Sequence, residues 1–93
     1  MMNKNLKALC HDNRRMVTGQ LYEVTDSGCE LIVQSLEAIP VFPKKTWVML
    51  NLLEEASQRT MNIEARLTSV FRRDGAWIYR LRWRQLPEML EAA

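Results

Sequence analysis

The chain has 93 residues, of which 47% are hydrophobic and 26% are charged. This composition is typical of a folded domain and excludes a disordered chain, and the length allows one core but neither two domains nor a large (β/α)₈ enzyme barrel. The net charge of +2 conceals an asymmetry, because residues 1–58 carry six basic and seven acidic side chains whereas residues 59–93 carry seven arginines and four acids. We therefore expect a single domain over residues 1–93, with a positive region in its second half.

Apolar patterning and turn residues predict four strands in the first part of the chain, three of them short and one, residues 15–25, long and mixed in pattern. They are residues 6–10, 15–25, 29–34 and 47–53. The segment 47–53 is apolar on both faces, which is typical of a strand that is covered on both sides. A shift in the pattern near Gly19 predicts a β-bulge. Residues 38–45 contain two prolines and are expected to form a loop.

The clearest strand pattern lies in residues 60–71 and 77–84. Both segments place apolar side chains mostly at odd positions and polar ones mostly at even positions, the period of a strand with one buried face. We expect the odd rows of both segments to face the core. In the second segment this row consists of Trp77, Tyr79, Leu81 and Trp83.

The connection between these two strands is constrained by their faces. Directly paired residues share a face, so the two odd-numbered apolar rows must pair with each other. A two-residue Asp-Gly loop would pair Phe71 with Ile78 and set the rows on opposite faces. We therefore predict a three-residue loop over residues 73–75, which pairs Phe71 with Trp77 and ends in a glycine-stabilised bulge.

The even positions of the same strands carry arginines. They are Arg66, Arg80, Arg82 and Arg84. The predicted register sets Arg66 opposite Arg82, a like-charge pair that is unfavourable unless an anion or an acid lies beside it. This face is a candidate surface for an anion or a partner, although a solvated outer face is the simpler interpretation.

Residues 87–92 follow the signals of a short helix. A proline suits the first helical position, and a glutamate follows it. The segment is too short to be stable alone, so we expect it to dock on the sheet. Many short strands without intervening helices predict an all-β fold, a small six-stranded antiparallel barrel with a short C-terminal helix.

Several classes of protein are disfavoured by what the residues lack. No segment resembles a signal peptide or reaches the ~18–20 apolar residues that cross a bilayer, so we expect a cytoplasmic protein without a transmembrane segment. Cys10, Cys29 and His11 are too few for a Cys/His zinc site, and the cysteines are expected to be reduced thiols. Without a nucleophile–base pair or a P-loop, the sequence predicts no enzyme and no cofactor.

The order of elements resembles the PilZ domain family over roughly residues 6–90. That family is a six-stranded antiparallel barrel with a C-terminal helix, and many members bind cyclic di-GMP. Its second strand ends in Asp/Asn-x-Ser-x-x-Gly; here Glu23-Val24-Thr25-Asp26-Ser27-Gly28 stands in that place, followed by an apolar strand. The segment 79–86 is similar to the family's last strand, which ends in an aromatic residue before the helix.

The family's second motif, Arg-x-x-x-Arg, departs from the pattern. It lies in an arm before the first strand, where two arginines grip guanine and phosphate groups. Residues 1–4 stand in that place here and contain no arginine. Arg14 and Arg15 are adjacent and open the second predicted strand, and we treat them as candidates to replace the arm. The match of Arg80 and Arg84 to the motif is accidental, because it falls in a strand near the other end.

The resemblance implies a ligand site at the second turn. Glu23 would accept from guanine or orient an arginine, Thr25 would donate to a phosphate or base, and Gly28 would let the backbone approach the ligand. The alternative interpretation is a polar hairpin turn, for which these residue types are also expected. The candidate ligand-binding residues are Arg14, Arg15, Glu23, Thr25, Asp26, Ser27 and Gly28.

Three functions remain open. The first is a bacterial PilZ-like signalling module that acts as a cyclic di-GMP receptor or effector adaptor. The second is a degenerate PilZ-like domain that does not bind the nucleotide and acts through a protein partner. The third is a small basic barrel that binds nucleic acid through the arginine face. The retained acid, hydroxyl and glycine favour the first, whereas the missing arm and the position of the arginines favour a partner surface.

Overall fold

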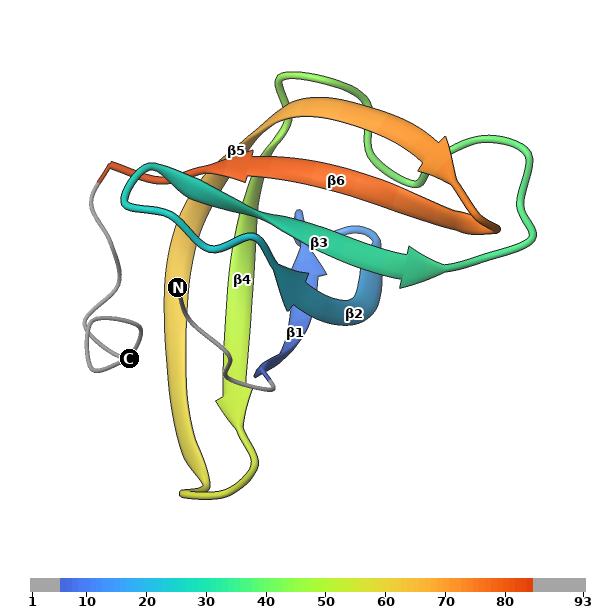
Figure 1. Cartoon of the computed structure of the whole chain (residues 1–93). Helices are drawn as coiled ribbons and strands as arrows, with labels where there is room; N and C mark the ends of the chain where they lie inside the picture. Colours follow the sequence, from blue (N-terminus) through green and yellow to red (C-terminus); the bar gives the residue numbers. More distant parts are fainter. Residues whose placement is uncertain (1–5, 85–93) are drawn as a thin grey trace.

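All six predicted segments form strands in the computed structural model, which describes residues 6–84 (Figure 1). The strands are β1 (Leu6–His11), β2 (Met16–Tyr22), β3 (Gly28–Gln34), β4 (Trp47–Glu54), β5 (Arg59–Arg73) and β6 (Ala76–Arg82). They close into an antiparallel barrel in the order β1-β2-β3-β6-β5-β4. The predicted all-β, six-stranded antiparallel barrel is therefore confirmed, whereas the predicted helix at residues 87–92 lies outside the described residues.

The barrel interior is filled by alternate side chains of all six strands. Phe42 joins them from the β3–β4 loop, and it is fully buried. Its ring meets that of Tyr79 edge to face at 6.1 Å between centroids, and the Tyr79 hydroxyl accepts a hydrogen bond of 3.0 Å from the backbone N–H of Val41. The predicted loop thus contributes to the core. Burial raises the pKa of the thiols of Cys10 and Cys29, which line the same interior as free cysteines.

Two strands end or pack differently from the prediction. β2 stops at Tyr22, because Glu23 adopts a φ of 50° that an extended strand does not allow. β4 buries only the face that carries Val48, Leu50 and Leu52, so the expectation of cover on both faces is wrong for the described residues.

The β5–β6 hairpin does not have the predicted three-residue loop. Asp74 and Gly75 have φ values of 51° and 78°, which is the signature of a two-residue type I′ turn. Phe71 consequently pairs with Ile78 rather than with Trp77. The Asp-Gly sequence favours this tight turn because its twist matches that of the flanking strands.

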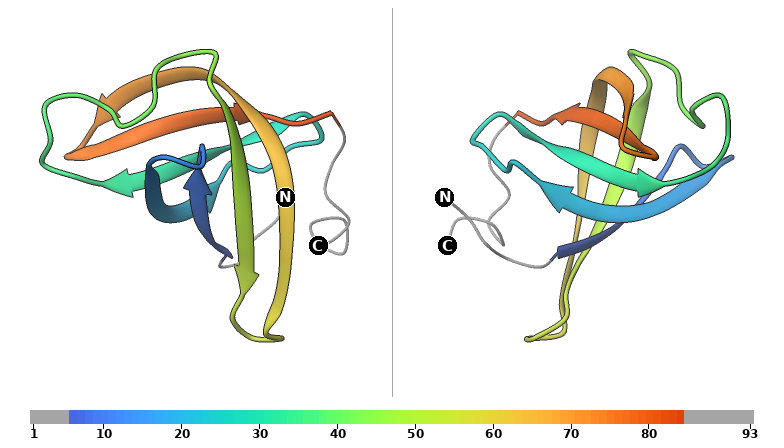
Figure 2. Two further views of the ribbon diagram at one scale, coloured as in Figure 1. Left: turned by 180° about the vertical axis from the view of Figure 1, so that it is seen from behind. Right: turned by 45° about the vertical axis from the view of Figure 1, so that its right-hand side comes forward.

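A β-bulge reconciles this turn with the core. It lies in β5 between Leu67 and Ser69, so that Leu67 still pairs with Leu81 inside the barrel as predicted. Beyond the bulge the inward row moves from odd to even positions: Val70 packs against the core, whereas Phe71 lies outside it. β5 also changes direction along its length, and the β4–β5 hairpin extends beyond the other strands (Figure 2).

Two glycines allow neighbouring strands to approach closely. A Cβ atom at Gly28 would lie 2.0 Å from the carbonyl oxygen of Leu81, and one at Gly19 would lie 2.3 Å from that of Ile32. The bulge predicted near Gly19 is absent, because β1 and β2 pair without a register shift. Gly19 instead lets the backbone of β2 approach the Ile32 carbonyl of β3.

The first prediction concerns the approach of β3 to β6. Gly28→Ala should lower the free energy of unfolding by about 3 kcal/mol, because the new methyl group meets backbone that cannot rotate away. Gly75→Ala is the matched control, since its Cβ meets open space and only the positive φ is unfavourable, at about 1 kcal/mol. Urea denaturation followed by circular dichroism measures both, and equal losses would contradict the packing role of Gly28.

Candidate functional site

An open hollow of about 920 Å³ lies on the outside of the barrel, where the β2–β3 turn meets β6. The turn and the first residue of β3 contribute Glu23, Thr25, Ser27 and Gly28 to its wall. β3 contributes Glu30, and the β5–β6 hairpin contributes Arg73, Arg80 and Arg82. The pairing of β3 with β6, which are far apart in the sequence, brings these two groups together.

The turn is held by its own hydrogen bonds. The Thr25 hydroxyl donates to the carbonyl of Gly28 at 3.2 Å and accepts from the backbone N–H groups of Ser27 and Gly28 at 3.3 and 3.2 Å. The Thr25 N–H also donates to the Gly28 carbonyl at 2.8 Å. The threonine therefore uses its hydroxyl proton within the turn, which matches the polar-turn interpretation.

Trp83 fastens this turn to the end of β6. Its indole N–H donates to the carbonyl of Asp26 at 3.1 Å, and its backbone N–H donates to the carbonyl of Ser27 at 3.0 Å. The indole is buried in the core cluster, and the core therefore holds the two N–H donors of Trp83 in place. Asp26 thus contributes a carbonyl to the fold, while its exposed side chain does not line the hollow.

Glu30 forms the floor of the hollow and is 7% exposed. Its Oε2 accepts a hydrogen bond from Nε of Arg80 at 3.0 Å, and its Oε1 accepts one from Arg73 at 3.3 Å. Both guanidinium groups also lie over the Phe71 ring, at 5.0 Å for Arg80 and 5.6 Å for Arg73. The carboxylate and the ring thereby orient both arginines.

Arg80 remains available to a ligand in this arrangement. Only its Nε is hydrogen-bonded within the described residues, so its two terminal nitrogens keep their donors. Arg82 lies directly opposite Gly28, and it makes no ion pair with a carboxylate of residues 6–84. The hollow therefore holds three arginines against two glutamates, an arrangement suited to an anion with polar edges.

The sequence did not single out Glu30 or Phe71. Alternation places Glu30 on the outer face of its strand, but its partner Arg80 lies on β6, which is not the next strand along the chain. The alternation predicts that Phe71 faces the core, whereas the bulge turns it outward. Neither position could be found without the strand order and the register.

Other predicted site residues lie elsewhere. Arg14 and Arg15 are in the β1–β2 turn, at the opposite end of β2 from Glu23, and do not line the hollow. The Asp12 carboxylate accepts hydrogen bonds from their backbone N–H groups at 3.0 and 2.8 Å, and these bonds, that from Arg15 first, lower the pKa of Asp12.

Arg66 and Arg84 are exposed and also lie outside the hollow. Arg66 instead places its guanidinium carbon 5.9 Å from the centre of the Trp47 ring. The predicted arginine face is thus divided, with Arg80 and Arg82 at the hollow and Arg66 beside an exposed tryptophan.

Comparison with known protein families, with curated proteins and with solved structures finds no match for this chain. Within residues 6–84 there is no group of three His, Cys, Asp or Glu side chains that could hold a metal ion. The same part of the chain contains no helix of the length and apolarity required to cross a membrane.

The second prediction measures the coupling between Glu30 and Arg80. A double-mutant cycle with Glu30→Gln and Arg80→Gln should give a coupling free energy of about 1 kcal/mol, because the carboxylate is buried and the arginine is half-exposed. The exposed pair of Lys7 and Glu55, at 2.6 Å, is the matched control and should give about 0.3 kcal/mol. If both cycles gave the same small value, Glu30 would not be the group that orients Arg80.

Proposed function

We propose that the chain is a PilZ-like signalling module that binds cyclic di-GMP in the hollow between the β2–β3 turn and β6. One observation carries the proposal: the turn that resembles the family's Asp/Asn-x-Ser-x-x-Gly motif and three arginines line the same hollow. The arginines of β5 and β6 take the place of the family's Arg-x-x-x-Arg motif, which residues 1–4 do not contain. The closed six-stranded antiparallel barrel is consistent with this family.

The chemistry of the hollow suits a guanine nucleotide. Guanine presents two acceptors, O6 and N7, that match the fork of an arginine, and Arg80 keeps both terminal nitrogens for such a contact. Glu23 lines the hollow as an exposed carboxylate that accepts from the donor edge of the base. Arg82 has no carboxylate partner among residues 6–84 and supplies positive charge for a phosphate.

The third prediction tests this function by calorimetric titration with cyclic di-GMP. The wild-type chain should bind in the micromolar range, and Arg80→Ala and Arg82→Ala should each weaken binding by about tenfold or more, since each removes a charge-assisted contact. Arg59→Ala, an exposed arginine of the β4–β5 hairpin, and Arg14→Ala should leave the affinity unchanged. If cyclic di-GMP gave no heat in calorimetry and no chemical-shift changes in NMR spectra of the wild-type chain, the proposal would be rejected.

A second candidate function is an adaptor that binds a protein partner without the nucleotide. The β3–β4 loop exposes Leu36 (96%) and Ile39 (75%). Arg72 donates to the carbonyls of residues 35 and 37 at 2.8 and 2.9 Å, and the Trp77 indole donates to that of residue 37 at 3.0 Å. A loop that is fixed by three hydrogen bonds and presents exposed aliphatic side chains is a feature of contact surfaces.

The fourth prediction separates the adaptor from the receptor. If the adaptor function is correct, an affinity pull-down from the source organism should recover a stable partner whose yield is unchanged by cyclic di-GMP. Leu36→Ser with Ile39→Ser should abolish recovery, because the apolar contact is lost, whereas Arg80→Ala should not. A partner that is retained by the loop variant, or that is released by the nucleotide, would exclude this function.

A further inference from the structure

A row of paired residues crosses the outside of the barrel. Trp47 of β4 pairs with Arg66 of β5, Arg66 pairs with Arg82 of β6, and Arg82 pairs with Gly28 of β3. Directly paired residues share a face, and the first three are exposed. With strands ~4.8 Å apart, the row extends roughly 14 Å from Trp47 to the hollow at Gly28.

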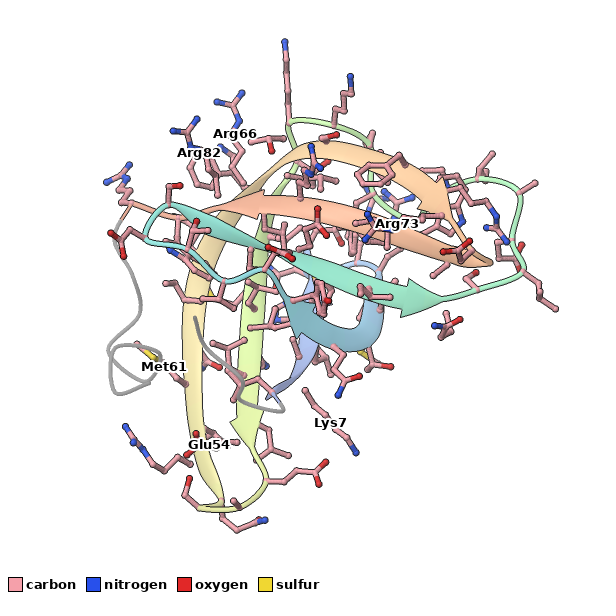
Figure 3. The ribbon with its side chains drawn as sticks, in the orientation of Figure 1. Lys7, Glu54, Met61, Arg66, Arg73 and Arg82 are labelled. Carbon is pink, nitrogen blue, oxygen red and sulfur yellow. The ribbon has the colours of Figure 1, made fainter. Side chains whose placement is uncertain are left out.

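The two arginines of this row form an unfavourable pair by themselves. Figure 3 shows their side chains extending outward from the same side of the sheet. Like charges directly opposite each other repel, and neither arginine has an ion-pair partner within residues 6–84. Glu64 lies two residues from Arg66 along β5 and forms no ion pair with it. By contrast, the neighbouring Arg73 and Arg80 share Glu30.

Trp47 is 48% exposed, although most large apolar residues of the strands face the core. Backbone hydrogen bonds hold it beside Arg66, since the Lys45 N–H donates to the Leu67 carbonyl at 2.7 Å and the Leu67 N–H donates to the Thr46 carbonyl at 2.9 Å. The core contact of β4 begins with the next residue, so the barrel interior gives no reason for a tryptophan here. Its ring lies next to two arginines that have no carboxylate partner within residues 6–84, and the guanidinium carbon of Arg66 is 5.9 Å from the ring centre.

We propose that this row is a nucleotide-binding element in which Arg66 and Arg82 bind a phosphodiester group and the Trp47 ring stacks on the base beside it. An anion between the two guanidinium groups removes their repulsion, and aromatic rings bind bases of any sequence by stacking. The inference shares Arg82 and Gly28 with the hollow of the proposed function, but it does not require that the ligand is cyclic di-GMP. A cyclic dinucleotide or a single strand of nucleic acid carries the required chemistry.

The observations favour this ligand over an anionic membrane. Apart from Trp47 the row contains no exposed apolar side chain that could enter a bilayer, and the exposed Leu36 and Ile39 lie in the β3–β4 loop rather than in the row. A bare phosphate would account for the two arginines but would make no contact with the exposed ring of Trp47 beyond the one that Arg66 already makes.

The experiment titrates the full chain with cyclic di-GMP and, separately, with a fluorescein-labelled 12-residue oligouridine at low salt. At least one of the two should bind the wild-type chain. Trp47→Leu should weaken that binding about tenfold, whereas Trp47→Phe, which keeps a stacking ring, should weaken it less than about threefold. Arg66→Gln should weaken it about tenfold as well, and Arg59→Gln should have no effect. Thermal unfolding verifies that each variant is folded.

The outcomes separate this inference from the proposed function. Binding of cyclic di-GMP that depends on Arg80 and Arg82 but not on Trp47 or Arg66 would overturn the inference and leave the proposed function standing. Binding of the oligouridine alone, with dependence on Trp47 and Arg66, would support the inference and reject cyclic di-GMP. Failure of both ligands to bind would overturn the inference. Phosphatidylserine vesicles are tested in parallel, and if Trp47→Leu weakened vesicle binding as much as it weakened nucleotide binding, the inference would also be overturned.

Discussion

The tip of the β5–β6 hairpin and the barrel core require strand registers that differ by one residue. The Asp-Gly turn pairs Phe71 with Ile78, whereas the core requires Leu67 to pair with Leu81. The barrel accommodates both through the bulge, which leaves Thr68 out of the ladder while its hydroxyl donates to the Arg80 carbonyl at 3.2 Å. Every outward side chain near the hairpin tip depends on this adjustment.

The adjustment creates the support of the site. Once Phe71 faces outward, its ring lies under the guanidinium groups of Arg73 and Arg80, and the buried Glu30 holds them from β3. A carboxylate in this position neutralises part of the positive charge of the two arginines and orients their guanidinium groups. The hollow is therefore organised by residues that the family resemblance does not include.

The turn that carries the resemblance has a structural role of its own. Thr25 closes the turn with its hydroxyl, and Gly28 allows β3 to approach the backbone of β6. Trp83 then fixes the turn from the end of β6. Because the Thr25 hydroxyl is already hydrogen-bonded within the turn, the arginines opposite it, rather than the turn alone, are the groups from which affinity for a ligand is expected.

Local sequence patterns predict the six strands, the loop after β3 and the inward row of β6, because apolar periodicity and turn residues are local properties of the chain. They also predict that Arg66 faces Arg82. The outward direction of Phe71 and the contact of Glu30 with Arg80 follow only from the folded chain. These depend on the bulge and on the pairing of β3 with β6, which arise from closing the barrel and leave no local pattern in the sequence.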